Sequence, residues 1–245
     1  FNPRPRCLST LTDAFQLHPD VRSYGTHLRR AAAQTLSAAA HADATLVTPS
    51  LPDALPALIA KTEILKDLVR VVDLGPFKHT VDDGLDLRKA AFECLDTLLD
   101  ACLHPTKNAG AMTRLGAAAG YLDALTSGLG DQYDVKMVAH AVLVKLCRGD
   151  AKRDARERLA ALCEPMKKTL TAKLKSDAVK QEIDRNEDLI RSCLRAVVAL
   201  SALEGAMDDA AFAGLIEKTI GGSDALTASF AAIKAETKAV EKGDV

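Results

Sequence analysis

Two adjacent carboxylates, Asp82 and Asp83, are of the residue type and spacing that could share acid–base chemistry. They stand directly before Gly84 and a strongly periodic apolar segment, where a carboxylate commonly accepts hydrogen bonds from free backbone N–H groups. Asp83 is therefore predicted to cap a helix that begins near Leu85, with Asp86 completing a carboxylate variant of the capping box. Helix capping is the favoured interpretation of the carboxylate pair.

The histidines and cysteines give little support to metal or nucleophile chemistry. The histidines lack the spacing of metal ligands: His18, His27, His41, His79, His104 and His140. The cysteines form no Cys-x-x-Cys pair and mostly occupy apolar positions of predicted helices: Cys7, Cys94, Cys102, Cys147, Cys163 and Cys193. Phosphate-binding, zinc-protease and serine-hydrolase motifs are absent. We predict no catalytic residue, metal site or cofactor, and a reducing, intracellular compartment.

The composition argues against general binding to nucleic acid or membrane. The 245 residues include 32 basic and 33 acidic side chains, for a net charge of −1, and no apolar run has the length of a membrane span. The basic run Met166–Lys175, followed by Lys180, has no aromatic residues to stack bases. A solvated helix face is the favoured interpretation of this run, with a phosphate-binding patch as the alternative.

Ala- and Leu-rich segments with helical periodicity fill most of the chain. Helices are predicted at Cys7–Leu17, His27–His41, Leu51–Thr62, Leu85–Leu103, Tyr121–Leu129, Val135–Leu146, Arg153–Leu174, Asp184–Leu203, Asp208–Thr219 and Asp224–Val240. His104–Gly120 is predicted to be a loose linker. The long second helices of successive pairs begin alike, at Asp86, Asp134 and Asp188, at spacings of about 48 and 54 residues. Such an Asp can bond across to the adjacent pair, so we predict an all-α, HEAT-repeat solenoid of four to five helical pairs, with an irregular helical bundle as the alternative.

The segment Val69–Asp86 interrupts this helical pattern. It is rich in β-branched residues, and Gly75-Pro76 prevents a helix from running through it. A β-hairpin and a long loop are equally supported, with extended residues resuming at His79–Val81. Phe77, followed by two basic groups, is either an exposed anchor for a partner or a residue that packs back onto the helices. The predicted partner-binding residues are Gly75, Pro76, Phe77, Lys78, His79, Thr80, Val81 and Asp82.

A family resemblance centres on the same residues. Val72–Leu95, with its uninterrupted Gly-Pro-Phe-Lys-His-Thr-Val-Asp-Asp-Gly block, closely resembles the carboxy-terminal region of cullin-associated, neddylation-dissociated proteins, also called TATA-binding-protein-interacting proteins. The similarity continues in Leu129–Met137, Leu162–Pro165, Val179–Ser192 and Arg195–Leu200. It covers roughly Thr26 to Leu203 and is highly specific in the Gly-Pro-Phe block.

The resemblance implies an armadillo-type, HEAT-repeat module without catalytic activity. It implies binding to the N-terminal region of a cullin scaffold in competition with Skp-type adaptors and their F-box partners, and so exchange of substrate receptors and assembly of SCF-type ubiquitin ligases. Gly75 to Asp83 would be the hairpin that enters the adaptor site. The alternative is a transcription cofactor that binds the TATA-binding protein. The expected location is the cytoplasm and nucleus.

The match to the family is uneven along the chain. Residues 1–25 match weakly, residues 26–240 form the expected domain with its hairpin near 69–84, and residues 241–245 are expected to fray. His104–Gly120 looks longer and looser than its family counterpart. The chain lacks an initiator Met and most of the family's repeat array, which suggests a fragment or an incorrectly assigned start. We therefore expect this chain to compete with adaptors, but not to enclose the cullin as the family's whole repeat array would.

Overall fold

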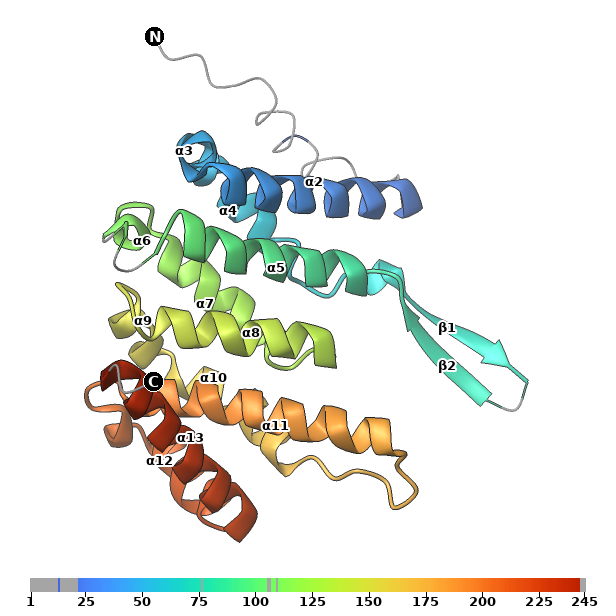
Figure 1. The fold of residues 1–245 in the computed structure, drawn as a ribbon. Helices are drawn as coiled ribbons and strands as arrows, with labels where there is room; N and C mark the ends of the chain where they lie inside the picture. Colours follow the sequence, from blue (N-terminus) through green and yellow to red (C-terminus); the bar gives the residue numbers. More distant parts are fainter. Residues whose placement is uncertain (1–12, 14–21, 76, 105–106, 109, 243–245) are drawn as a thin grey trace. The chain divides into compact units, whose positions relative to one another are not determined.

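The computed structural model describes residues 13, 22–75, 77–104, 107–108 and 110–242, which form α-helices and one two-stranded antiparallel sheet (Figure 1). The predicted helix Cys7–Leu17 lies almost wholly outside these residues. The chain divides into two compact units, residues 1–124 and residues 125–245. The predicted fold class, an all-α helical repeat with one β-hairpin, is confirmed.

In the first unit, helices pack in pairs and a hairpin stands between two of them. Its described elements are α2 (Arg22–Ala42), α3 (Ala44–Val47), the 3-10 turns η1 (Thr48–Ser50) and η2 (Lys66–Leu68), α4 (Leu51–Ile59), β1 (Val69–Leu74), β2 (Phe77–Asp82), α5 (Leu85–Ala101), α6 (Ala111–Arg114) and α7 (Ala117–Gly128), whose last turn belongs to the second unit. Helices α2 and α5 lie side by side and bury small aliphatic side chains such as Ala33, Leu36 and Leu95. Tyr121 is fully buried, and its hydroxyl donates a hydrogen bond of 2.9 Å to the carbonyl oxygen of Leu95.

The sequence repeat predicted a bond between neighbouring helical pairs, and one such bond is present. The carboxylate of Asp86, at the start of α5, accepts a hydrogen bond of 2.9 Å from the guanidinium of Arg30 on α2. Both side chains are substantially exposed, so this ion pair contributes little free energy and serves mainly to fix the register of α2 against α5.

The second unit continues the pattern with longer helices. Its described elements are α8 (Tyr133–Leu146), α9 (Lys152–Glu157), α10 (Leu159–Thr171), α11 (Lys180–Ser201), the 3-10 turn η3 (Ala206–Asp208), α12 (Ala210–Gly214), the π-helical turn η4 (Leu215–Ile220) and α13 (Asp224–Lys242). Helix α11 packs against α8, α10 and α13 and buries Leu194, Val197 and Leu200 in its C-terminal half. Among the described helices, none combines the length and apolar character needed to span a bilayer.

Two of the predicted boundaries are wrong. The single helix predicted at Arg153–Leu174 is interrupted at Arg158, whose φ of −109° and ψ of 12° lie outside the α-helical range, so α9 and α10 are separate. The loose linker predicted at His104–Gly120 contains α6 and the first turn of α7. Gly110 and Gly116 adopt positive φ, which lets this segment fold into two short turns with buried alanines.

Candidate functional site

The segment between η2 and α5 is a β-hairpin, as predicted, rather than a long loop. Strands β1 and β2 pair antiparallel over their whole length, from Val69 opposite Asp82 to Leu74 opposite Phe77. Figure 1 shows the two strands extending away from the N-terminal end of α5 within the first unit. The second strand begins at Phe77, two residues earlier than the extended stretch that the sequence indicated.

The register places the turn of the hairpin between Leu74 and Phe77. Gly75 has a φ of 71°, a left-handed value that a residue with a side chain rarely adopts, and a Cβ atom added there would meet nothing within 4 Å. A glycine with positive φ at the first connecting residue is typical of the type I′ and II′ turns, whose twist matches that of the flanking strands. The Gly-Pro pair therefore sets the hairpin register as well as ending the helical pattern.

A buried ion pair connects the base of the hairpin to α5. Both oxygens of the Asp82 carboxylate accept hydrogen bonds from the Arg88 guanidinium, at 2.7 and 3.2 Å, and Asp82 also accepts a bond of 3.0 Å from the backbone N–H of Gly84. The side chain of Arg88 is only 2% exposed and that of Asp82 only 12%. Two parallel bonds to a planar guanidinium fix both position and direction, so the last residue of β2 is held rigidly on the first turn of α5.

The predicted capping role of Asp83 is wrong. Gly84 is the N-cap residue of α5, no side chain caps it, and the Asp83 carboxylate instead pairs with Arg70 of β1 at 2.8 Å. The hydrogen bond from Arg70 lowers the pKa of the Asp83 carboxyl. The backbone N–H of Asp83 donates to the carbonyl oxygen of Leu68 at 3.0 Å, so this residue joins the two ends of the hairpin.

The upper part of the hairpin presents polar side chains to solvent. Lys78, His79 and Thr80 are exposed, whereas Val81 and Asp82, nearer the helices, are partly buried. Val71, opposite Thr80, is 63% exposed, a high value for a large apolar side chain. Pro76 and the side chain of Phe77 lie outside what the structure describes, so the role of Phe77 as an exposed anchor stays a prediction.

The described residues bring together no arrangement suited to covalent or metal chemistry. No cluster of three His, Cys, Asp or Glu side chains that could hold a metal ion occurs among them. Burial raises the pKa of the Cys163 and Cys193 thiols to about 12, so both are protonated at neutral pH and neither is a ready nucleophile. What the hairpin offers instead is a ribbon braced by the Asp82–Arg88 pair, with exposed polar side chains and the exposed Val71.

Arg88 is the site residue that the sequence interpretation missed. It lies three residues before Ala91 and seven before Leu95, both buried on the apolar face of α5. A single arginine within an apolar stripe signals a buried partner, since an unpaired guanidinium would be costly there. That spacing could have identified Asp82 as the partner, because it is one of the two carboxylates immediately before the helix.

Comparisons with known proteins identify relatives over most of the chain. Residues 46–219 match the family described as TATA-binding protein interacting (TIP20). Cullin-associated NEDD8-dissociated protein 1 of Arabidopsis thaliana is 46% identical over 80% of the chain, and protein 2 of Mus musculus is 38% identical over 80%. The cullin-associated NEDD8-dissociated protein 1, C-terminal part, of Emericella nidulans is 34% identical over 74%.

The chain spans about 15% of the length of the first two relatives and about 16% of the third. The family match includes the hairpin, the buried ion pair at its base and most of the helices of both units. The chain therefore belongs to the family of cullin-associated NEDD8-dissociated, TATA-binding-protein-interacting proteins and corresponds to part of their carboxy-terminal region.

Proposed function

We propose that this chain is a non-catalytic module that binds the N-terminal region of a cullin and competes there with Skp-type adaptors and their F-box partners. The observation that carries the proposal is the projecting, rigidly braced hairpin inside the segment that matches the family. The relatives are named as cullin-associated, which supports a cullin as the partner. Release of one adaptor and entry of another would exchange substrate receptors and promote assembly of SCF-type ubiquitin ligases.

The arrangement suits competition rather than chemistry. The turn at Gly75 can enter a pocket on the partner, because the strands extend away from the N-terminal end of α5 (Figure 1). Asp73 and Lys78, which pair near the turn, are both exposed. The exposed Lys78 and His79 follow Phe77 in the strand and would supply polar contacts beside it. Contacts along the helical repeat would add to this anchor and spread the binding free energy over a wide surface.

Replacing Phe77 and Lys78 together with alanine is expected to weaken displacement of a Skp-type adaptor from a cullin by about tenfold or more. The reason is that the substitution removes the aromatic anchor and one group of its polar rim but keeps the backbone of the hairpin. Displacement is measured by fluorescence transfer between labelled cullin and labelled adaptor as the chain is titrated. The helical content, followed by circular dichroism, should not change.

The matched control replaces Leu46 and Lys66 with alanine, since these are an exposed apolar residue and an exposed lysine outside the hairpin. It is expected to displace the adaptor as the unmodified chain does. Full displacement by the Phe77→Ala, Lys78→Ala variant would show that the hairpin is not the competing element.

A second candidate function is that of a transcription cofactor that binds the TATA-binding protein. The observation in its favour is the description of the matching family, which covers residues 46–219. A pull-down that offers equal amounts of a cullin and the TATA-binding protein to the immobilised chain separates the two candidates, because retention of the second alone would refute the cullin proposal. The location in cytoplasm and nucleus stays a prediction, which imaging of the tagged chain would test.

A further inference from the structure

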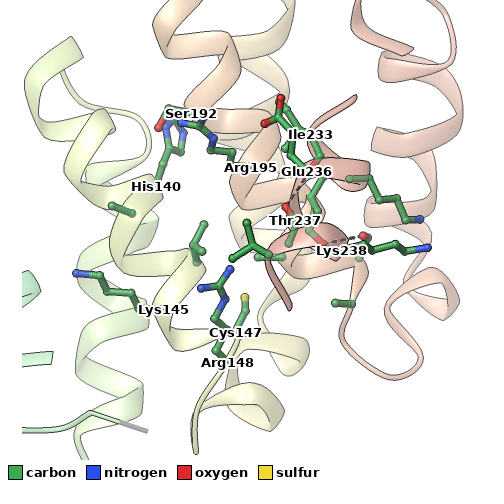
Figure 2. Close-up of a pocket in the computed structure, with 18 of the residues that line it drawn as sticks. His140, Lys145, Cys147, Arg148, Ser192, Arg195, Ile233, Glu236, Thr237 and Lys238 are labelled. Carbon is green, nitrogen blue, oxygen red and sulfur yellow. Dashed lines mark hydrogen bonds between the residues drawn. The ribbon is translucent and has the colours of Figure 1, made fainter. Parts of the chain in front are cut away.

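A groove of about 910 Å³ lies within the second unit, between α8, α11 and α13 (Figure 2). Helix α11 packs against both of the other helices and supplies the wall that they share. The residues of α8 that line the groove run from Met137 to Lys145, a length of about 12 Å at 1.5 Å per residue, and Cys147, Arg148 and Lys152 line it beyond the end of α8. The part along α8 therefore offers room for about two turns of a docked helix.

The floor of the groove is apolar. It is formed by side chains that all three helices contribute: Met137, Val144, Val198, Ala199, Ile233 and Val240. Val240 is 66% exposed, so part of this apolar surface faces solvent. An apolar floor between helices is the surface on which an amphipathic helix typically docks.

The rim of the groove is strongly basic. Its cationic side chains are Lys145, Arg148, Lys152, Arg195, Lys234 and Lys238, and Glu236 is the single carboxylate among the lining residues. The chain as a whole is almost neutral, with a net charge of −1, so the lining of this groove is more positive than the chain average. Six cations around an apolar floor select for a ligand that carries negative charge beside apolar groups.

A buried histidine marks the wall of the groove on α8. His140 is only 1% exposed, and neither of its ring nitrogens has a hydrogen-bond partner in the structure. Burial, reinforced by the charge of Lys136, lowers the pKa of His140 to about 3, so the imidazole is neutral at physiological pH. A neutral imidazole left without partners inside the protein costs stability, and it adds no charge of its own to the groove.

We propose that this groove binds a short amphipathic helix of a partner protein, with its apolar residues on the floor and its acidic residues against the basic rim. The proposal goes beyond cullin binding, because the groove lies in the second unit and shares no residue with the hairpin. The charge pattern identifies the partner by chemistry alone, as a segment in which leucine-like residues recur at helical spacing among aspartates and glutamates.

The test measures the fluorescence anisotropy of labelled synthetic helices of about 18 residues on the whole chain. One peptide has leucines on one face and glutamates elsewhere, the second has lysines in place of the glutamates, and the third is a scrambled acidic sequence. The first is expected to bind about tenfold tighter than either of the others and to weaken as salt is added, because exposed charges are screened. Equal binding of the three peptides, or no binding of the first, would overturn the proposal. Binding of a fatty-acid anion in place of the peptide would overturn it too.

Matched variants test whether the peptide binds in the groove. Ala141 is exposed on α8 and lines the groove, so Ala141→Glu and Ala141→Lys add side chains of similar bulk and opposite charge. The glutamate is expected to weaken binding of the acidic peptide about tenfold, and the lysine to preserve it. If both weaken binding equally, charge does not select the ligand and the proposal fails. Arg195→Glu, at a second exposed position, repeats the test on α11 should either Ala141 variant fold poorly.

Discussion

Replacing Arg88 with methionine is expected to lower the free energy of unfolding by about 3–5 kcal/mol, a large effect for a single substitution. Arg88 and Asp82 are joined by two hydrogen bonds in a site where both side chains are almost fully buried. Removal of the guanidinium leaves the Asp82 carboxylate desolvated and without its partner. Chemical denaturation followed by circular dichroism measures the change.

A second substitution shows how much of the lost stability comes from the unpaired Asp82 charge and how much from the lost packing of the Arg88 side chain. Asp82→Asn added to Arg88→Met removes the stranded charge but keeps an oxygen that can accept from the Gly84 N–H, so it is expected to restore more than half of the lost stability. Arg70→Met is the matched control, because it breaks the exposed Arg70–Asp83 pair at the same end of the hairpin and should change stability little. Equal losses from Arg88→Met and Arg70→Met would show that burial does not set the strength of the first pair.

The same substitution tests how the hairpin is held. In Arg88→Met the strands keep their own ladder, but their attachment to α5 is weakened, so hydrogen exchange of the β1 and β2 amides should become faster. Binding to a cullin should weaken as well, because a mobile hairpin loses more conformational entropy when a partner fixes it. Weaker cullin binding by Arg88→Met, in which Phe77 and Lys78 are unchanged, would thus support a role for the attachment of the hairpin to α5 in binding.

The break in the helical pattern was predictable from sequence because its signals are local. β-branched residues cluster on either side of Gly75-Pro76, and these preferences act within a few residues of the chain, whereas they left a hairpin and a loop equally supported. The apolar face of α5 was predictable for the same reason, since its helical periodicity lies within one continuous segment of the sequence. The cap at Asp83 was predicted wrongly because two neighbouring carboxylates compete for one helix start, and the choice depends on where Arg70 and Arg88 lie in space.

The basic groove between α8, α11 and α13, in contrast, could not be predicted from the sequence. Its basic rim is drawn from positions between Lys145 and Lys238, and no single segment of the sequence shows the excess of positive charge. The basic run at Met166–Lys175, which is the most conspicuous cluster of lysines in the sequence, contributes nothing to it. The cations converge only because α11 packs against α8 on one side and α13 on the other, a tertiary arrangement that periodicity alone does not specify.

His140 is expected to make the stability of the chain depend on pH. Its pKa of about 3 in the folded chain lies below the ordinary value of 6.5, so between these values the unfolded chain binds a proton that the folded chain does not. Stability from this group is therefore constant above about pH 6.5 and falls as the pH falls toward 3. Burial is the main reason that the imidazole stays neutral, and the charge of Lys136 on the same helix adds to it. Arg195 of α11 and Lys238 of α13, which line the same groove, are also basic.

The variant His140→Leu removes this dependence and the two unpartnered nitrogens together. It is expected to be more stable than the unmodified chain by about 1 kcal/mol at neutral pH. The advantage should grow by a further 2–3 kcal/mol, at about 1.4 kcal/mol per pH unit, between about pH 6.5 and pH 4.5. The measurement is the unfolding free energy of both chains across this range, with His27→Gln as the control for loss of an exposed histidine. Parallel pH profiles for the unmodified chain and His140→Leu would mean that the imidazole finds a partner or solvent in solution, and that it is not the desolvated group that its burial indicates.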